Sequence, residues 1–483
     1  MSLSDPKYLL LLAAVVLVFY LVQGHRARAA LLLSVSYAFY WHLSGYLALA
    51  LIFVTLVSYG GGLLLFRGQK APYRGVLFSI IIILALLPLL TFKYLAFVMG
   101  PIAAAYGVLP PAMPEALSIL PIGISFFTFV ALGYLIDVYL DIIEPERRPM
   151  ELALLLAFFP TVTAGPIERA SHFLPQFNFG RLRFSSERAI AASRLIFLGL
   201  FLKVVCADSL VNPVDAIFAD PSKFTPAEKL FALIHYAYYV YTDFAGYSLI
   251  AIGSAIFFGL AVLPNFHQPF LSASLVEFWR NWHISMSSWF RDYVFTPLRV
   301  HWRRYPRMGM VGALMVSFVL IGIWHGAGWT FVLFGAMHGV FVSFLTLTSK
   351  YREAIRARLR IPASLAQLSG IACTFALFTL TLVAFRARSI PDTMEFYLGI
   401  FSKDLFSAAP YFQPEAFKAL GFKSWTWAII AVVLVGDIFA KRGVLLEEMP
   451  ALLQLLIYNV GAALIAYGWV AHTAPQPFLY YGF

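Results

Sequence analysis

One uncharged stretch constrains the fold of this chain more than any other feature. Residues 308–349, between Arg307 and Lys350, run for 42 positions without an Asp, Glu, Lys or Arg. A helix that crosses a bilayer needs about 20 predominantly apolar residues, so the stretch is long enough for two crossings. Two histidines, His325 and His338, lie inside it. A titratable side chain is costly to bury in a membrane, so each histidine is a candidate functional residue.

The composition of the whole chain agrees with a membrane protein. The sequence is 61% hydrophobic and 12% charged, with a mean hydropathy of +0.80, whereas soluble domains carry about 25% charged residues. The apolar runs are continuous rather than alternating with a period of two, which favours helices. We predict an all-α, polytopic integral membrane bundle of about eleven spans with re-entrant or interfacial helices. The predicted spans include runs near 29–43, 46–66 and 151–164.

The positions of the basic residues indicate whether they interact with a membrane or with nucleic acid. The formal net charge is +11, but the Lys and Arg residues lie in short loops between apolar runs. Basic loops of this kind, such as 25–28, 67–74 and 144–148, are typical of the cytosolic side of a membrane protein. The lipid bilayer is therefore the expected partner, and nucleic acid is not. Cys206 and Cys373 are far apart in apolar surroundings, so neither a disulfide nor a metal site is predicted.

Residues 272–292 have the pattern of an amphipathic helix. Ser274 followed three residues later by Glu277 predicts a capping-box start. A mostly polar stripe would then pass through Arg280 and His283, opposite a face of large apolar side chains. Two interpretations stay open: a membrane-surface helix with a solvated basic face, or a helix that directs His283 towards His325 across a reaction chamber.

The neighbours of His325 favour a reactive role over simple burial. Gly326 and Gly328 remove side-chain bulk beside it, and Trp324 and Trp329 supply flat walls. A near-neutral imidazole can take a proton from a hydroxyl and later return it, as acyl transfer to an alcohol requires. A buried histidine bonded to a backbone carbonyl is the alternative. A simple hairpin turning at the glycines and a broken, re-entrant helix are both compatible with the sequence.

The other intramembrane polar residues have less specific interpretations. His338 follows His325 by 13 residues, about 220° around an unbroken helix, so we expect it to pack or to form a wall. Asp243 is an intramembrane carboxylate. It could orient an imidazole, pair with Arg280, or form a structural ion pair, and the sequence does not choose among these.

A series of ordered motifs resembles those of the membrane-bound O-acyltransferase (MBOAT) family, and within it the bacterial alginate O-acetyltransferase branch. The motifs are Leu120–Phe126 with Tyr134, Asp137 and Tyr139, then Ala164–Arg169, Asp243–Ser248, Asn265–Phe270, Glu277–Ser285, Trp289–Tyr293, Trp324–Ala327, Gly335–Gly339 and Pro477–Tyr480.

The resemblance implies a fold and a set of site residues. The family fold is a helical bundle around a membrane-traversing tunnel. We expect a single domain over 1–483, in which 1–150 and 351–483 supply flanking spans and 151–350 forms the catalytic core with the tunnel. The predicted catalytic residues are His325 and His283. The predicted substrate-contacting or tunnel-lining residues are Asp243, Arg280, Trp324 and Asn265.

The resemblance also implies an activity. The expected reaction moves an acyl group, most simply acetyl, from a cytosolic donor such as acetyl-CoA to hydroxyls of an exopolysaccharide or envelope glycan, or to a periplasmic relay protein. Acetyl-CoA would be a co-substrate, with no bound cofactor, and the enzyme would lie in a bacterial inner membrane. Two alternatives remain: D-alanyl transfer in teichoic acid modification, whose enzymes share these motifs, and a glycan or lipid transporter without chemistry.

Overall fold

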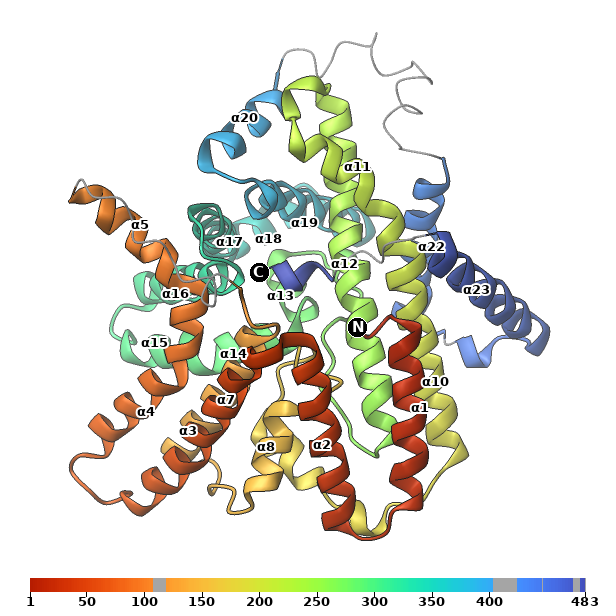
Figure 1. Ribbon diagram of the computed structural model, residues 1–483. Helices are drawn as coiled ribbons and strands as arrows, with labels where there is room; N and C mark the ends of the chain where they lie inside the picture. The colour runs from red at the N-terminus through yellow and green to blue at the C-terminus, as the bar shows by residue number, and fades with distance from the viewer. Residues whose placement is uncertain (107–118, 403–423, 445, 472–477, 483) are drawn as a thin grey trace. The chain divides into compact units, whose positions relative to one another are not determined.

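The computed structural model describes residues 1–106, 119–402, 424–444, 446–471 and 478–482 (Figure 1). Within these ranges the chain is helical, and the one β feature is an isolated antiparallel bridge between Phe266 and Trp282. Eight helical segments are long and apolar enough to cross a membrane, which confirms an all-helical, multi-pass membrane protein. These eight are His25–Arg67, Arg74–Ala103, Ser186–Asn212, Pro226–Phe257, Pro306–His325, Trp329–Leu347, Ala363–Arg386 and Ala451–Ala471.

The eight segments and the predicted spans differ in ways that the helix boundaries explain. His25–Arg67 contains two 20-residue helices, α2 (His25–Ser44) and α3 (Ala48–Arg67), which are the spans predicted near 29–43 and 46–66. The prediction of a span near 151–164 is wrong. Helix α8 (Pro149–Ala157) has nine residues, about half of what a bilayer requires, and the apolar residues after it form turns buried in protein.

The chain divides into two compact units. Unit 1 comprises Met1–Gly199, Tyr247–Pro264 and Tyr480–Phe483, and unit 2 comprises Leu200–Gly246 and Asn265–Leu479. These boundaries do not coincide with the predicted division at residues 150 and 350, which stays a prediction. All six predicted site residues belong to unit 2.

Unit 1 is built mainly from the N-terminal helices. Helix α3 packs on α4 (Arg74–Leu89) and α7 (Ile124–Tyr139), and α2 packs on α8 (Figure 1). The remaining helices are α1 (Pro6–Leu21), α5 (Leu95–Ala105), the short α9 (Ala170–Phe173) and most of α10 (Ser186–Leu200). Helix α7 is buried along nearly its whole length, so it forms the centre of this unit.

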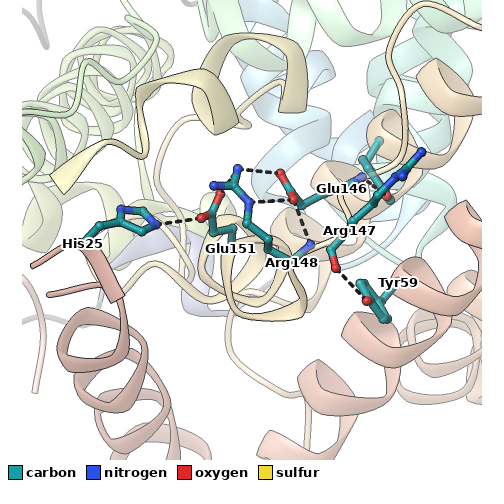
Figure 2. Close-up of polar contacts among 7 residues, drawn as sticks. His25, Tyr59, Glu146, Arg147, Arg148 and Glu151 are labelled. Atoms are coloured by element: carbon teal, nitrogen blue, oxygen red, sulfur yellow. Dashed lines mark hydrogen bonds and ion pairs between the residues drawn. The ribbon is translucent and has the colours of Figure 1, made fainter. Parts of the chain in front are cut away.

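A polar network ties the basic loop before α8 to the start of α2 (Figure 2). Glu151 is fully buried, and its carboxylate bonds to His25 Nε2 at 2.9 Å and to the Arg148 guanidinium. Arg148 also bonds to Glu146, at 3.1 Å. A buried carboxylate is tolerated only when it is paired, so these contacts compensate for the burial of Glu151.

Unit 2 contains the long central helix α12 (Pro226–Phe257) up to residue 246 and the helices that follow the segment 265–271. These helices are α13 (Leu275–Asn281), α14 (Ile284–Phe290), α15 (Thr296–His301), α16 (Pro306–His325), α17 (Trp329–Leu347), α18 (Ser349–Arg358), α19 (Ala363–Arg386), α20 (Ile390–Ile400), α22 (Ser424–Lys441) and α23 (Ala451–Ala471). Helix α11 (Asp208–Ala219) precedes α12.

Helices α16 and α17 form a tight hairpin. A methyl group added at Gly322 would lie 2.2 Å from the backbone oxygen of Phe331, and one added at Gly335 would lie 2.2 Å from that of Phe318. Small residues let membrane helices approach this closely. The chain turns at 326–328, so the simple hairpin is the correct one of the two arrangements considered for His325.

Candidate functional site

His325 is the last residue of α16 and is enclosed by aromatic rings. Its side chain is buried, and its ring centroid lies 4.9 Å from that of Trp324, 5.1 Å from Phe385 and 5.8 Å from Phe334. These rings come from α16, α19 and α17 respectively. A shell of this kind keeps bulk water away from the imidazole.

The segment around His283 differs from its prediction. The predicted N-cap is confirmed, because Glu277 N donates to Ser274 Oγ at 3.2 Å, whereas Glu277 Oε2 accepts from Ala273 N at 2.8 Å rather than from the N–H of Ser274. A single helix over 272–292 is wrong, because α13 ends at Asn281 and α14 begins two residues after Trp282. The amphipathic pattern of side chains continues across this break, so the pattern does not reveal it.

Backbone pairing with residues 265 and 266 holds the break between α13 and α14. Trp282 is extended and forms the β-bridge to Phe266, and Ile284 N donates to the backbone oxygen of Asn265 at 2.9 Å. Between them His283 adopts a left-handed conformation, with φ 43° and ψ 54°. This conformation costs a non-glycine residue on the order of 1–3 kcal/mol and persists only where surrounding structure imposes it.

The side chain of His283 contacts the indole of Trp324, which also contacts His325. Its ring lies 5.7 Å from Trp324 and 4.6 Å from Phe244, on α12, in an edge-to-face contact. Its Nδ1 lies 3.2 Å from Asn265 Oδ1. Burial lowers the pKa of the His283 imidazole to about 3, so the ring is neutral near pH 7. Trp324 therefore contacts both of the histidines predicted to be catalytic.

Asp243 has a partner that the sequence analysis did not identify. Its carboxylate is fully buried and lies 2.7 Å from Lys203 Nζ, which is also 2.7 Å from Asp208. Its second oxygen accepts from the backbone N–H of Leu479 at 3.0 Å. Of the three expected alternatives, the ion pair is the one formed, and pairing with Arg280 is wrong. Lys203 could have been found from sequence, because an intramembrane lysine is itself a functional-site signal.

Arg280 and His338 occupy opposite kinds of environment. Arg280 is exposed on α13, and its role in lining a tunnel stays a prediction. His338 is fully buried, with Trp279 Nε1 donating to Nδ1 at 3.3 Å and Thr381 Oγ1 2.9 Å from Nε2. Because the protein occupies both of its nitrogens, His338 has the contacts of a packing residue. Pro477, the first residue of the last motif, lies outside the described residues.

Comparison with known proteins places these residues in a family. The profile described as MBOAT, membrane-bound O-acyltransferase family, matches residues 149–386. The probable alginate O-acetylase AlgI of Azotobacter vinelandii is 34% identical over 415 residues, covering 83% of this chain and 78% of the relative. The peptidoglycan O-acetyltransferase of Helicobacter pylori is 32% identical over 308 residues, covering 58% and 57% of the two chains.

A third relative differs in its named acyl group. The teichoic acid D-alanyltransferase of Bacillus subtilis is 27% identical over 319 residues, covering 64% of this chain and 78% of the relative. The profile match includes Asp243, Asn265, Arg280, His283, Trp324 and His325. With identity above 30% over most of the length of an alginate O-acetylase, the chain belongs to the membrane-bound O-acyltransferase family and is a multi-pass membrane O-acyltransferase.

Proposed function

We propose that this enzyme moves an acetyl group from cytosolic acetyl-CoA to hydroxyls presented outside the inner membrane. The acceptor is an exopolysaccharide or another envelope glycan, or a periplasmic relay protein that passes the group on. The contact of two buried imidazoles, His283 and His325, with the single indole of Trp324 carries the proposal. The names of the alginate and peptidoglycan O-acetylating relatives support acetyl as the group and a glycan as the acceptor.

The chemistry requires one proton to move twice. His325 takes the proton from the acceptor hydroxyl as its oxygen attacks the thioester carbonyl. The carbon–sulfur bond then breaks, and the proton returns from the imidazolium to the departing thiolate, which yields an ester and free CoA. The aromatic shell of His325 limits hydrolysis of the thioester, the main competing reaction.

The two ends of the α16–α17 hairpin favour opposite sides for donor and acceptor. The open end carries Arg303 and Arg304 before α16, Arg307 in the first turn of α16, and α18 with four basic residues after α17. Basic segments of this kind favour the cytosol. The 20 residues of α16 measure about 30 Å, so His325 would lie towards the outer side. The thioester would then have to reach it from the cytosol through the protein.

The similarity to the teichoic acid enzyme supports a second candidate, transfer of D-alanine from a carrier-bound thioester. Both candidates use the same acid–base chemistry and differ in donor and acyl group. The donor is therefore the property to measure first.

The test is release of free CoA from acetyl-CoA by the purified protein in lipid vesicles, with and without a glycan acceptor. His325→Ala should lower the rate by about 10²–10⁴-fold, the usual contribution of a general acid–base group, with normal protein levels in the membrane. His42→Ala, which removes an exposed imidazole from α2, is the matched control.

Three outcomes would contradict the proposal. Activity of His325→Ala within a few-fold of wild type would remove His325 from the mechanism. Consumption of a carrier-bound D-alanyl thioester, but not of acetyl-CoA, would select the second candidate. Transport of a glycan without cleavage of either thioester would identify a transporter.

A further inference from the structure

We infer that Asn265 is a positioning residue that fixes His283 as the Nδ1–H tautomer, so that its Nε2 carries the lone pair and can accept a hydrogen bond. The inference rests on the proposed function and assigns a role within the same site. Asn265 was predicted to line the tunnel, which stays a prediction; its side chain is 1% exposed and contacts Ser285 of α14.

The hydrogen bonds of Asn265 identify its side-chain atoms. The backbone N–H of Ser285, which can only donate, points to Asn265 Oδ1 at 3.4 Å, and Ser285 Oγ lies 2.6 Å from the same atom. The atom that receives the N–H must be the amide oxygen rather than the amide nitrogen. An amide oxygen accepts and does not donate.

The tautomer of His283 follows from this assignment. Its Nδ1 lies 3.2 Å from the same Asn265 oxygen, so Nδ1 must carry the hydrogen. In a neutral imidazole the other nitrogen then carries the lone pair. Nε2 is therefore the nitrogen of His283 that can accept a hydrogen bond, while His325 remains the residue proposed to take the proton.

Asn265 also controls where the ring points. Its backbone oxygen accepts from Ile284 N at 2.9 Å, on the far side of the left-handed residue. The edge-to-face contact with Phe244, at an interplanar angle of 86°, restricts rotation of the imidazole. Backbone and side chain of one residue thus hold His283 on both sides, which is the preorganisation that an acid–base group needs.

His338 is an internal contrast to this arrangement. Trp279 Nε1 is a donor only, so His338 accepts at Nδ1 and carries its hydrogen on Nε2, directed to Thr381. Two buried histidines of one unit therefore have opposite tautomers. His338, whose hydrogen bonds to Trp279 and Thr381 give the opposite tautomer, is the matched control.

The charged and titratable groups on the elements around His283 bear on any pH effect. His325 lies beyond Trp324 on α16, and Asp243, next to Phe244 on α12, is paired with Lys203. Glu277 and Arg280 on α13, and Arg291 and Asp292 after α14, are half-buried or exposed and reach solvent. Asn265→Asp adds a negative charge directly beside Nδ1 of His283. Its effect on the pKa of His283 is therefore separable from that of these groups.

The experiment compares pH–rate profiles of acetyl transfer for wild type, Asn265→Asp, Asn265→Ala and Thr381→Val. Asn265→Asp keeps an acceptor at Nδ1 but adds a negative charge, which raises the pKa of His283. The acid limb of the profile should move up by roughly one to three pH units, with activity retained at alkaline pH. Asn265→Ala should lower kcat by about 10-fold or more, within the 10²–10⁴-fold of a whole acid–base group, with KM for acetyl-CoA unchanged.

Thr381→Val, which removes a hydrogen bond from His338, should leave the shape of the profile unchanged. An acid limb of Asn265→Asp that coincides with wild type, or full kcat in Asn265→Ala, would overturn the inference.

A second measurement needs no exchange at position 265. Nitrogen-15 spectra of histidine-labelled wild type, with the signals assigned by His283→Asn, report which nitrogen carries the hydrogen. An Nε2–H signal for His283 would overturn the inference even if the Asn265 variants do not fold. If wild type cleaves no acetyl-CoA while His283 is the Nδ1–H tautomer, the proposed function fails and the tautomer assignment stands.

Discussion

The buried ion triad of unit 2 offers a direct test of how burial sets the strength of an ion pair. Lys203 lies 2.7 Å from both Asp243 and Asp208, and all three side chains are almost completely buried. Lys203→Met would leave two carboxylates without their shared cation. Removing one partner of a buried pair costs about 3–5 kcal/mol, a factor of roughly 10²–10⁴ in the ratio of folded to unfolded protein.

Asp243→Asn should be milder, because Lys203 keeps Asp208 and the new amide oxygen can still accept from Leu479 N. Its expected cost is that of one hydrogen bond to a charged group, about 1.5–3 kcal/mol. The same unit supplies a matched control in the pair between Arg386 and Asp215. That pair is 2.6 Å long, but its side chains are 38% and 49% exposed, so Asp215→Asn should cost about 0–1 kcal/mol.

The assay is reversible unfolding in mixed detergent micelles, with the free energy of unfolding measured for the three variants under identical conditions. The expected order of destabilisation is Lys203→Met, then Asp243→Asn, then Asp215→Asn. Equal costs for Asp243→Asn and Asp215→Asn, or a Lys203→Met variant within about 1 kcal/mol of wild type, would refute the argument from burial.

Two further predictions concern packing and pH. Gly322→Ala should destabilise the protein by about 1–3 kcal/mol or more, because the added methyl meets the backbone of α17. Gly436→Ala places its methyl in open space and should be neutral, so equal thermal stability of the two variants would contradict the prediction. The hydrogen bond that His172 donates to the Glu168 carboxylate raises the pKa of His172 above its ordinary 6.5, so its stabilisation is fully present below that value and is lost as pH rises through the folded-state pKa. Because His172 is partly exposed, the loss should stay below about 1 kcal/mol, and a wild-type stability difference between acidic and alkaline buffer that His172→Gln does not reduce would contradict this.

Features that depend on sequence near one another could be predicted. The length of the uncharged stretch predicted two crossings with His325 near the glycines between them, because a bilayer fixes how many residues a crossing needs. The choice between a simple hairpin and a broken helix stayed open. The N-cap at Ser274 was equally local. The prediction of a span near 151–164 was wrong, because an apolar segment buried in protein has the same composition as one buried in lipid.

Features that depend on contacts between distant segments could not be predicted. The break at His283 is imposed by hydrogen bonds to Asn265, and no side-chain period reports a left-handed residue. The pairing of Asp243 with Lys203, 40 positions earlier, could not be predicted, because the sequence can identify Lys203 as a candidate residue but only the fold brings the two side chains together. The residues missed at the site, Phe244, Ser285 and Phe385, are ordinary core residues by composition and act only through where the fold places them.

The left-handed backbone at His283 means that the residues favoured by folding and the residues favoured by the proposed chemistry differ at this position. In a library of all twenty residues at this position, abundance should favour glycine, asparagine, aspartate and histidine itself, which tolerate this conformation better than other residues. Activity should instead depend on the imidazole. A population of cells selected first for membrane content and then for acetylated product would therefore enrich different residues at the same codon, so folding and chemistry could be read as two distinct fitness profiles.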